Sequence, residues 1–216
     1  MYSLPNIFYS FFIGICIGSF LNVVIYRFPN ELSIVKPRSF CPNCKTQLTW
    51  KENIPLISWL MQRAKCINCS TYISIRYPLI EFLTGILFII FINSSPTFYN
   101  FESSFIFKQF LSWIFLSLLI CISLIDIDNF WIPQGLINFG FFSGLLGLVF
   151  VDLFNNRIID NYLIFKGLTT SVVAFFICES LRYLAKKIFK KDALGKGDSK
   201  LVAMIGIWLG PLGTLF

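Results

Sequence analysis

The sequence lacks histidine altogether and has few charged residues. Only 13% of its 216 residues are charged, about half the roughly 25% that an average soluble domain carries. Hydrophobic residues make up 56% of the chain, and phenylalanine alone contributes 26 residues. A soluble domain of this length exposes too much of its surface to hide that much apolar area. The composition therefore predicts a membrane protein.

The absence of histidine also limits the chemistry. It excludes the Ser-His-Asp triad, the Cys-His dyad and every zinc hydrolase that binds its metal through histidine. Acid–base catalysis near neutral pH must then use aspartate, glutamate, cysteine, lysine or tyrosine.

Several apolar stretches are long enough to cross a hydrocarbon core of about 30 Å as helices of about 17–25 residues. The first is not a removable signal peptide, because no basic segment precedes it and no A-x-A-like site follows it. We expect an all-α polytopic membrane protein with about six transmembrane helices. The expected spans are residues 7–26, 77–92, 107–125, 135–151, 163–181 and 201–216.

The net charge of +7 is concentrated in two connections between these spans. Residues 27–76 contain eight lysines and arginines and residues 182–200 contain seven, which is fifteen of the 18 in the chain. Short cytoplasmic connections carry such an excess. With six spans, this places the N-terminus outside and both basic connections in the cytoplasm. The opposite connections, 93–106 and 152–162, contain one basic residue, Arg157. The basic excess indicates topology and attraction to anionic lipid, with no nucleic-acid partner.

Four cysteines in the connection after the first span form two C-x-x-C pairs separated by 21 residues, which are Cys41, Cys44, Cys66 and Cys69. This spacing matches a zinc ribbon, in which each pair contributes two thiolates to a tetrahedral ion. A loop of about 50 residues with few apolar side chains cannot build its own core, and a structural metal would hold it together. Disulfides and a redox role are the alternatives, but the predicted cytoplasmic location favours Zn²⁺.

Acidic residues mark the predicted cytoplasmic boundary of the membrane. Asp126 and Asp128 directly follow the third span, and Asp198 precedes the sixth within a Gly-x-Gly-Asp sequence. Carboxylates at such positions are costly and are candidates for function, although they can also simply cap helix ends. If Asp126 and Asp198 converge, the two carboxyls would share a proton and act as base and acid, as in aspartic proteases.

Four segments in order resemble the bacterial type IV prepilin peptidases, the leader peptidase / N-methyltransferases of the GxGD-type aspartic membrane protease family. They are GICIGSFLNVVIYRFP (residues 14–29), the cysteine connection (41–81), LIDIDNFWIP (124–133) and GKGDSKLVAMIGIWLG (195–210). The sequence departs from the family at Gln134, where relatives commonly carry Asp or Asn. It also ends at Phe216, where family members usually continue through further helices.

The resemblance implies an aspartic endopeptidase of the inner membrane that removes the basic leader of prepilins or pseudopilins after a glycine, at the cytoplasmic face. Asp126 and Asp198 correspond to the catalytic pair, with Gly195, Gly197, Asp128 and Lys200 in support. The cysteine connection accompanies members that also methylate the new N-terminus with S-adenosylmethionine. The expected parts are residues 1–26 (first span), 27–76 (metal-binding loop) and 77–216 (peptidase core).

Two other functional classes remain open. A membrane assembly scaffold of the same fold that has lost its activity is one, and the intact Asp126 and Asp198 argue against it. A membrane thiol oxidoreductase that uses the C-x-x-C pairs is the other. The sequence identifies neither the pilin substrate, nor the binding site of S-adenosylmethionine, nor the oligomeric state.

Overall fold

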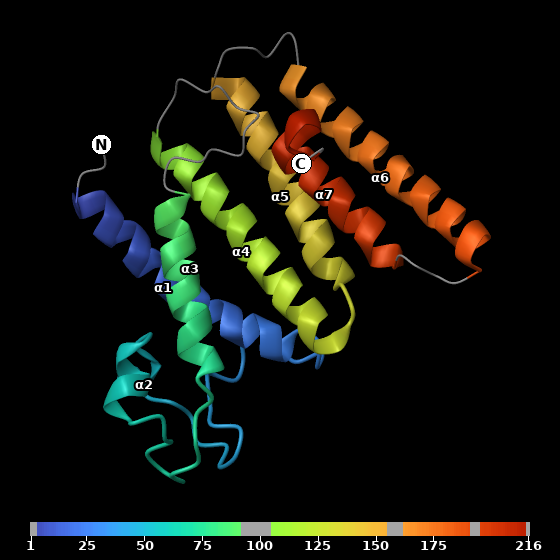
Figure 1. The fold of residues 1–216 in the computed structure, drawn as a ribbon. Helices are drawn as coiled ribbons and strands as arrows, with labels where there is room; N and C mark the ends of the chain where they lie inside the picture. The colour runs from blue at the N-terminus through green and yellow to red at the C-terminus, as the bar shows by residue number, and fades with distance from the viewer. Residues whose placement is uncertain (1–3, 92–104, 155–161, 191–194, 215–216) are drawn as a thin grey trace. The chain divides into compact units, whose positions relative to one another are not determined.

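The computed structural model describes residues 4–91, 105–154, 162–190 and 195–214 (Figure 1). Its regular elements are helices, and the predicted all-α class is confirmed; two isolated β-bridges are the extended pairings among these residues. The elements are α1 (Leu4–Arg27), the short 3₁₀ helix η1 (Lys51–Asn53), α2 (Ile57–Met61), α3 (Arg76–Ile90), α4 (Phe105–Asn129), α5 (Gln134–Phe154), α6 (Tyr162–Phe189) and α7 (Lys196–Thr214).

Four helices of the described residues are long and apolar enough to cross a membrane, over Leu4–Arg27, Gln109–Asn129, Gln134–Val151 and Leu163–Ile188. The other two predicted spans also form helices, but these are shorter. The 15 residues of α3 extend about 22 Å at 1.5 Å per residue, and α7 is kinked at Gly210, which has a φ of 65° and precedes Pro211. Most of the two predicted external connections, 93–106 and 152–162, lies outside the described residues.

The chain divides into two compact units. The first comprises Met1–Ile92 and Leu119–Leu124, and the second Asn93–Leu118 and Ile125–Phe216. The cysteine loop and α3 thus belong to the same unit as α1, and both predicted catalytic aspartates belong to the second.

Small residues allow α1 and α3 to pack closely in the first unit. A Cβ atom on Gly14 would lie 2.7 Å from the Cα atom of Gly85, and one on Gly18 would lie 2.7 Å from the Cα atom of Glu81. The amide of Asn22 adds a polar link, since its Nδ2 donates to the carbonyl of Tyr77 over 3.1 Å. In an apolar solvent, close backbone packing and hydrogen bonds of this kind hold helices together.

Replacing Gly14 with alanine should therefore weaken the first unit. The new methyl group would meet the backbone of Gly85, which cannot rotate away, and such overpacking costs about 1–3 kcal/mol. The measurement is the thermal unfolding midpoint in detergent, which should fall by several degrees. Gly147→Ala is the matched control, because its Cβ would meet only the flexible side chain of Leu111, at 3.1 Å. Equal midpoints for the two variants would contradict the packing account.

In the second unit, α5, α6 and α7 pack against one another, with α7 in contact with both neighbours (Figure 1). The core of this unit includes fully buried side chains of α5 and α7, which are Leu148, Val151, Met204 and Ile207. Two polar contacts fix α7 within it. Trp208 donates its indole N–H to the carbonyl of Gly140 on α5 over 2.8 Å, and the Ser171 hydroxyl on α6 donates to the carbonyl of Ala203 over 2.7 Å.

Candidate metal centre and active site

The cysteine loop contains a short internal repeat that the sequence analysis did not identify. Both C-x-x-C pairs belong to a Cys-x-x-Cys-x-Thr segment, at residues 41–46 and 66–71. In each segment the first cysteine donates its N–H to the threonine carbonyl, over 3.0 Å for Cys41 to Thr46 and 2.9 Å for Cys66 to Thr71. A β-bridge then closes each turn. The loop is therefore built from two turns of the same design.

The two turns bring the four predicted metal ligands together. All four Sγ atoms lie within 4.8 Å of one another, with Cys41 and Cys69 separated by 3.8 Å and Cys44 and Cys66 by 4.0 Å. Four sulfurs at about 2.3 Å from a tetrahedral zinc ion are about 3.8 Å apart. The cysteines are free thiols, and the arrangement can hold a metal ion.

A threonine hydroxyl supports the second cysteine of each turn. Thr71 Oγ1 lies 3.3 Å from Cys69 Sγ and accepts a 2.8 Å hydrogen bond from the Asn43 amide. Hydrogen bonds from the side chain and backbone of Thr71 lower the pKa of the Cys69 thiol to about 5, and those of Thr46 lower the pKa of Cys44. Both thiols thus favour the thiolate, which is the form that binds metal.

The first predicted catalytic residue, Asp126, lies in the last turn of α4, and its side chain is half-buried, whereas Asp128 is exposed. Helix α4 ends three residues after Asp126 at Asn129, and the backbone N–H of Phe130, a residue with a φ of 51°, donates to the Asp126 carbonyl over 2.7 Å. This turn leads directly to Pro133, which is fully buried and precedes α5.

Contacts along α4 and α7 indicate that Asp126 and Asp198 lie toward the same end of the second unit. The rings of Phe115 and Trp208 stack with centroids 5.2 Å apart, and Leu118 and Met204 both pack against Gly140, so the helices run antiparallel. From the stacked rings, Asp126 is 11 residues further along α4 and Asp198 is 10 residues back along α7. At 1.5 Å per residue these distances are about 16 and 15 Å. Among the described residues, no hydrogen bond joins the two carboxylates.

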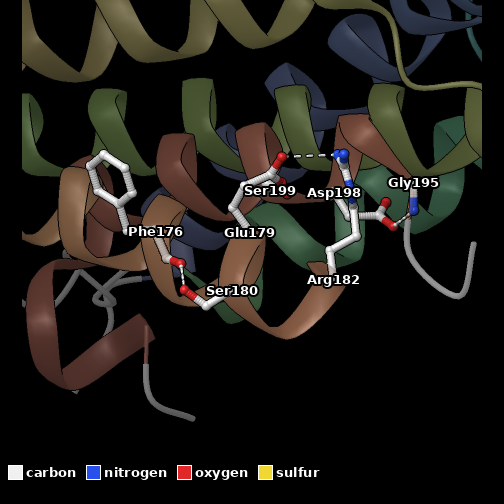
Figure 2. Close-up of polar contacts among 7 residues, drawn as sticks. All are labelled: Phe176, Glu179, Ser180, Arg182, Gly195, Asp198 and Ser199. Atoms are coloured by element: carbon white, nitrogen blue, oxygen red, sulfur yellow. Dashed lines mark hydrogen bonds and ion pairs between the residues drawn. The ribbon is translucent and has the colours of Figure 1, made fainter. Parts of the chain in front are cut away.

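The Asp198 carboxylate caps its own helix. Gly195 directly precedes α7, and its backbone N–H donates to Asp198 Oδ2 over 2.9 Å (Figure 2). This is the reciprocal half of a capping box, in which the third helical residue satisfies the N–H of the N-cap residue. A negative charge in the first turn also suits the helix dipole. Asp198, the second predicted catalytic residue, is thus also a helix-capping residue.

Gly197 and Lys200 are the other two residues that were expected to support catalysis. Both lie near the start of α7, where they face residues close to the start of α5. A Cβ on Gly197 would lie 3.0 Å from Ile132 Cβ, so the glycine permits the segment after α4 to approach α7. Lys200 Nζ donates to Gln134 Oε1 over 2.6 Å. The Gln134 side chain, which departs from the family pattern, thus serves as an acceptor for Lys200.

A polar cluster beside Asp198 was missed by the sequence analysis. The Ser199 hydroxyl donates to Glu179 Oε2 on α6 over 2.9 Å, and Arg182 forms a 3.0 Å ion pair with Glu179 Oε1 (Figure 2). Glu179 is the single acidic residue within the predicted span 163–181, and an ionisable residue in a span is a candidate for function or positioning. That signal was available in the sequence. The cluster ties the start of α7, and hence Asp198, to α6.

Two family models together match most of the chain. The model described as the bacterial Peptidase A24 N-terminal domain matches residues 12–94, which include α1, the cysteine loop and α3. The model described as the type IV leader peptidase family matches residues 113–216, which include Asp126 and Asp198. No solved structure matches the chain.

Curated relatives are similar over nearly the whole chain. A prepilin leader peptidase/N-methyltransferase of Myxococcus xanthus is 38% identical over 99% of this chain, which spans 62% of that relative. A type 4 prepilin-like proteins leader peptide-processing enzyme of Escherichia coli is 34% identical, with 92% of this chain matched to 75% of the relative. A prepilin leader peptidase/N-methyltransferase of Neisseria gonorrhoeae is 33% identical over 92% of this chain and 72% of its own length.

Proposed function

The chain belongs to the type IV leader peptidase family, and from this premise we propose that it cleaves the basic leader from prepilins or pseudopilins and methylates the new N-terminus. The observation that supports the peptidase activity is that Asp126 at the end of α4 and Asp198 at the start of α7 lie toward the same end of two antiparallel helices. The names of the relatives, which span both activities, support the methyltransferase half.

The two aspartates supply the acid and the base for hydrolysis. One carboxylate takes a proton from water while the water oxygen attacks the scissile carbonyl carbon, and the other carboxyl donates a proton to the carbonyl oxygen. The tetrahedral intermediate then collapses as the amine leaves with a proton, which gives a leader that ends in a carboxylate and a free N-terminal amine. This sequence of steps needs no histidine.

The surroundings of the pair match these roles. Asp198 has one carboxylate oxygen bound to the N–H of Gly195, which fixes its orientation and leaves the other oxygen for the substrate. Asp128 is exposed beside Asp126 and adds negative charge that attracts a basic leader. The distribution of lysine and arginine supports a cytoplasmic location for this end of the unit and an external N-terminus. We therefore assign the chain to the bacterial inner membrane.

In this proposal, residues 27–76 serve the methyltransferase activity and residues 77–216 form the peptidase. The four thiolates hold a structural zinc ion, because a tetrahedral set of four sulfurs is typical of zinc. When bound, S-adenosylmethionine supplies a methyl group, and the neutral N-terminal amine accepts it and loses a proton.

The experiment incubates the purified chain with a full-length prepilin and S-adenosylmethionine in detergent, followed by identification of the new N-terminus. We expect cleavage after the glycine at the end of the leader and a methyl group on the residue that follows. A prepilin that keeps its leader would contradict the peptidase proposal, and cleavage without methylation would contradict the methyltransferase proposal alone.

A further inference from the structure

A cavity of about 390 Å³ lies within the first unit. Its wall combines three parts of that unit. The last turns of α1 contribute Asn22, Tyr26 and Arg27, and the first turns of α3 contribute Tyr77 and Glu81. The cysteine loop between them contributes Phe40, Cys41, Cys66 and Tyr72. The volume falls within the range of about 300–1,000 Å³ that is usual for small-molecule sites.

Two carboxylates give this cavity negative charge. Glu81 is only 8% exposed, and its Oε2 accepts the backbone N–H of Leu56 over 2.7 Å. Glu52 accepts the hydroxyl and N–H of Thr49, over 2.6 and 2.8 Å, and these bonds lower the pKa of its carboxyl. Within the described part of the chain, neither carboxylate forms an ion pair with lysine or arginine.

The cation that lines the cavity, Arg27, does not neutralise this charge. Its buried guanidinium donates to backbone carbonyls, with 2.9 Å to Ser33 and 2.8 Å to Pro37 as the two shortest bonds. These hydrogen bonds hold the start of the loop against the end of α1. A buried carboxylate favours a cationic partner, because the ligand then compensates the cost of burying the charge.

Aromatic rings form much of the remaining wall. Trp59 is fixed by its indole N–H, which donates to the carbonyl of Ile73 over 3.1 Å, and Tyr26, Tyr72 and Tyr77 also face the cavity. Aromatic faces stack on planar ring systems and attract cations that have little hydration. A ligand with a positive centre and a planar ring satisfies both the rings and the carboxylates.

We propose that this cavity binds S-adenosylmethionine, with Glu52 and Glu81 facing its positive sulfonium and ammonium groups and the aromatic rings holding its adenine. The inference rests on the methyltransferase half of the proposed function and gives that activity a site, which the family resemblance alone does not. The last turns of an apolar helix line the cavity, so the methyl donor sits at the edge of the membrane.

The candidate metal centre forms part of the wall of this cavity. Cys41 and Cys66, the buried cysteine of each turn, line the cavity, so a metal ion held by both turns would also fix the distance between Phe40 and Tyr72. Removal of the metal should then abolish binding of the donor.

The test is the dissociation constant of radiolabelled S-adenosylmethionine, measured by equilibrium dialysis on the purified, zinc-loaded full chain. Glu52→Gln and Glu81→Gln should each weaken binding at least tenfold, because each removes one charged partner at nearly constant shape. Glu31→Gln is the matched control, since this exposed carboxylate in the same connection does not line the cavity. Zinc content verifies that each variant keeps its loop folded.

A second ligand separates charge recognition from a general loss of structure. S-adenosylhomocysteine has the same adenosine but a neutral thioether, so the wild type should bind it less tightly, and the two variants should reduce this preference. A wild type that methylates prepilin while both variants bind the donor as tightly as Glu31→Gln would overturn the site assignment and leave the proposed activity intact. A wild type that neither binds the donor nor methylates would overturn both.

Discussion

Replacing Asp198 with asparagine is expected to lower the rate of leader cleavage by about 10⁴-fold or more. Asparagine keeps the shape of the side chain, and its amide oxygen can still accept the N–H of Gly195, so the cap of α7 survives. What is lost is the ability to take up and release a proton, which hydrolysis by a pair of carboxyls requires. The same loss is expected for Asp126→Asn.

The double variant makes this prediction specific. Residues that act as one unit are not additive, so Asp126→Asn combined with Asp198→Asn should be no slower than either single variant. Asp128→Asn, which alters an exposed carboxylate two residues from Asp126, should reduce the rate far less, through weaker attraction of the basic leader. The measurement is single-turnover cleavage of a prepilin with enzyme in excess. Cleavage by either single variant within tenfold of the wild-type rate would contradict the assignment.

Removal of the metal is expected to unfold the cysteine loop. Structural zinc sites of this kind contribute on the order of 10 kcal/mol to folding, and the loop has few buried side chains besides Cys41 and Cys66. Hydrogen exchange of residues 41–72 should therefore rise sharply after treatment with a chelator, or in Cys66→Ser. Exchange in α5, within the second unit, should change little.

Cys16→Ser is the matched control for the metal prediction, because Cys16 is an exposed thiol of α1 outside the cluster. It should keep one zinc ion per chain and normal protection of the loop. Zinc well below one equivalent in the wild type under reducing conditions, with the loop still protected, would contradict a structural metal. That outcome would favour the thiol oxidoreductase interpretation.

Features determined by local spacing were predictable from the sequence. The C-x-x-C pairs predicted the cluster of Cys41, Cys44, Cys66 and Cys69, because two such pairs at this separation are the known pattern of a four-cysteine metal site. The apolar runs predicted all the long helices. Helix ends were predicted less well. Helices α4 and α6 continue to Asn129 and Phe189, beyond the expected ends at residues 125 and 181, and α7 begins at Lys196, before the expected start at residue 201. Polar residues continue these helices beyond the apolar runs, and hydropathy does not contain the kink of α7 at Gly210.

Features that depend on contacts between distant segments were not predictable. The contact of Glu179 with Ser199 joins residues 20 positions apart on two helices, and the cavity of the first unit combines residues from α1 to α3. Only the packed structure brings such residues together. The threonine repeat is different, since Cys-x-x-Cys-x-Thr was visible in the sequence and needed only a comparison of the two halves of the loop.

The central claim is that this chain is a leader peptidase whose chemistry depends on Asp126 and Asp198. Its most direct test is the intact mass of a prepilin after incubation with the wild-type chain or with Asp198→Asn, both in the presence of S-adenosylmethionine. The account predicts that the wild type yields a product without its leader and heavier by one methyl substitution, whereas the variant leaves the prepilin mass unchanged. A prepilin of unchanged mass in both reactions, or of shortened mass in both, would contradict it.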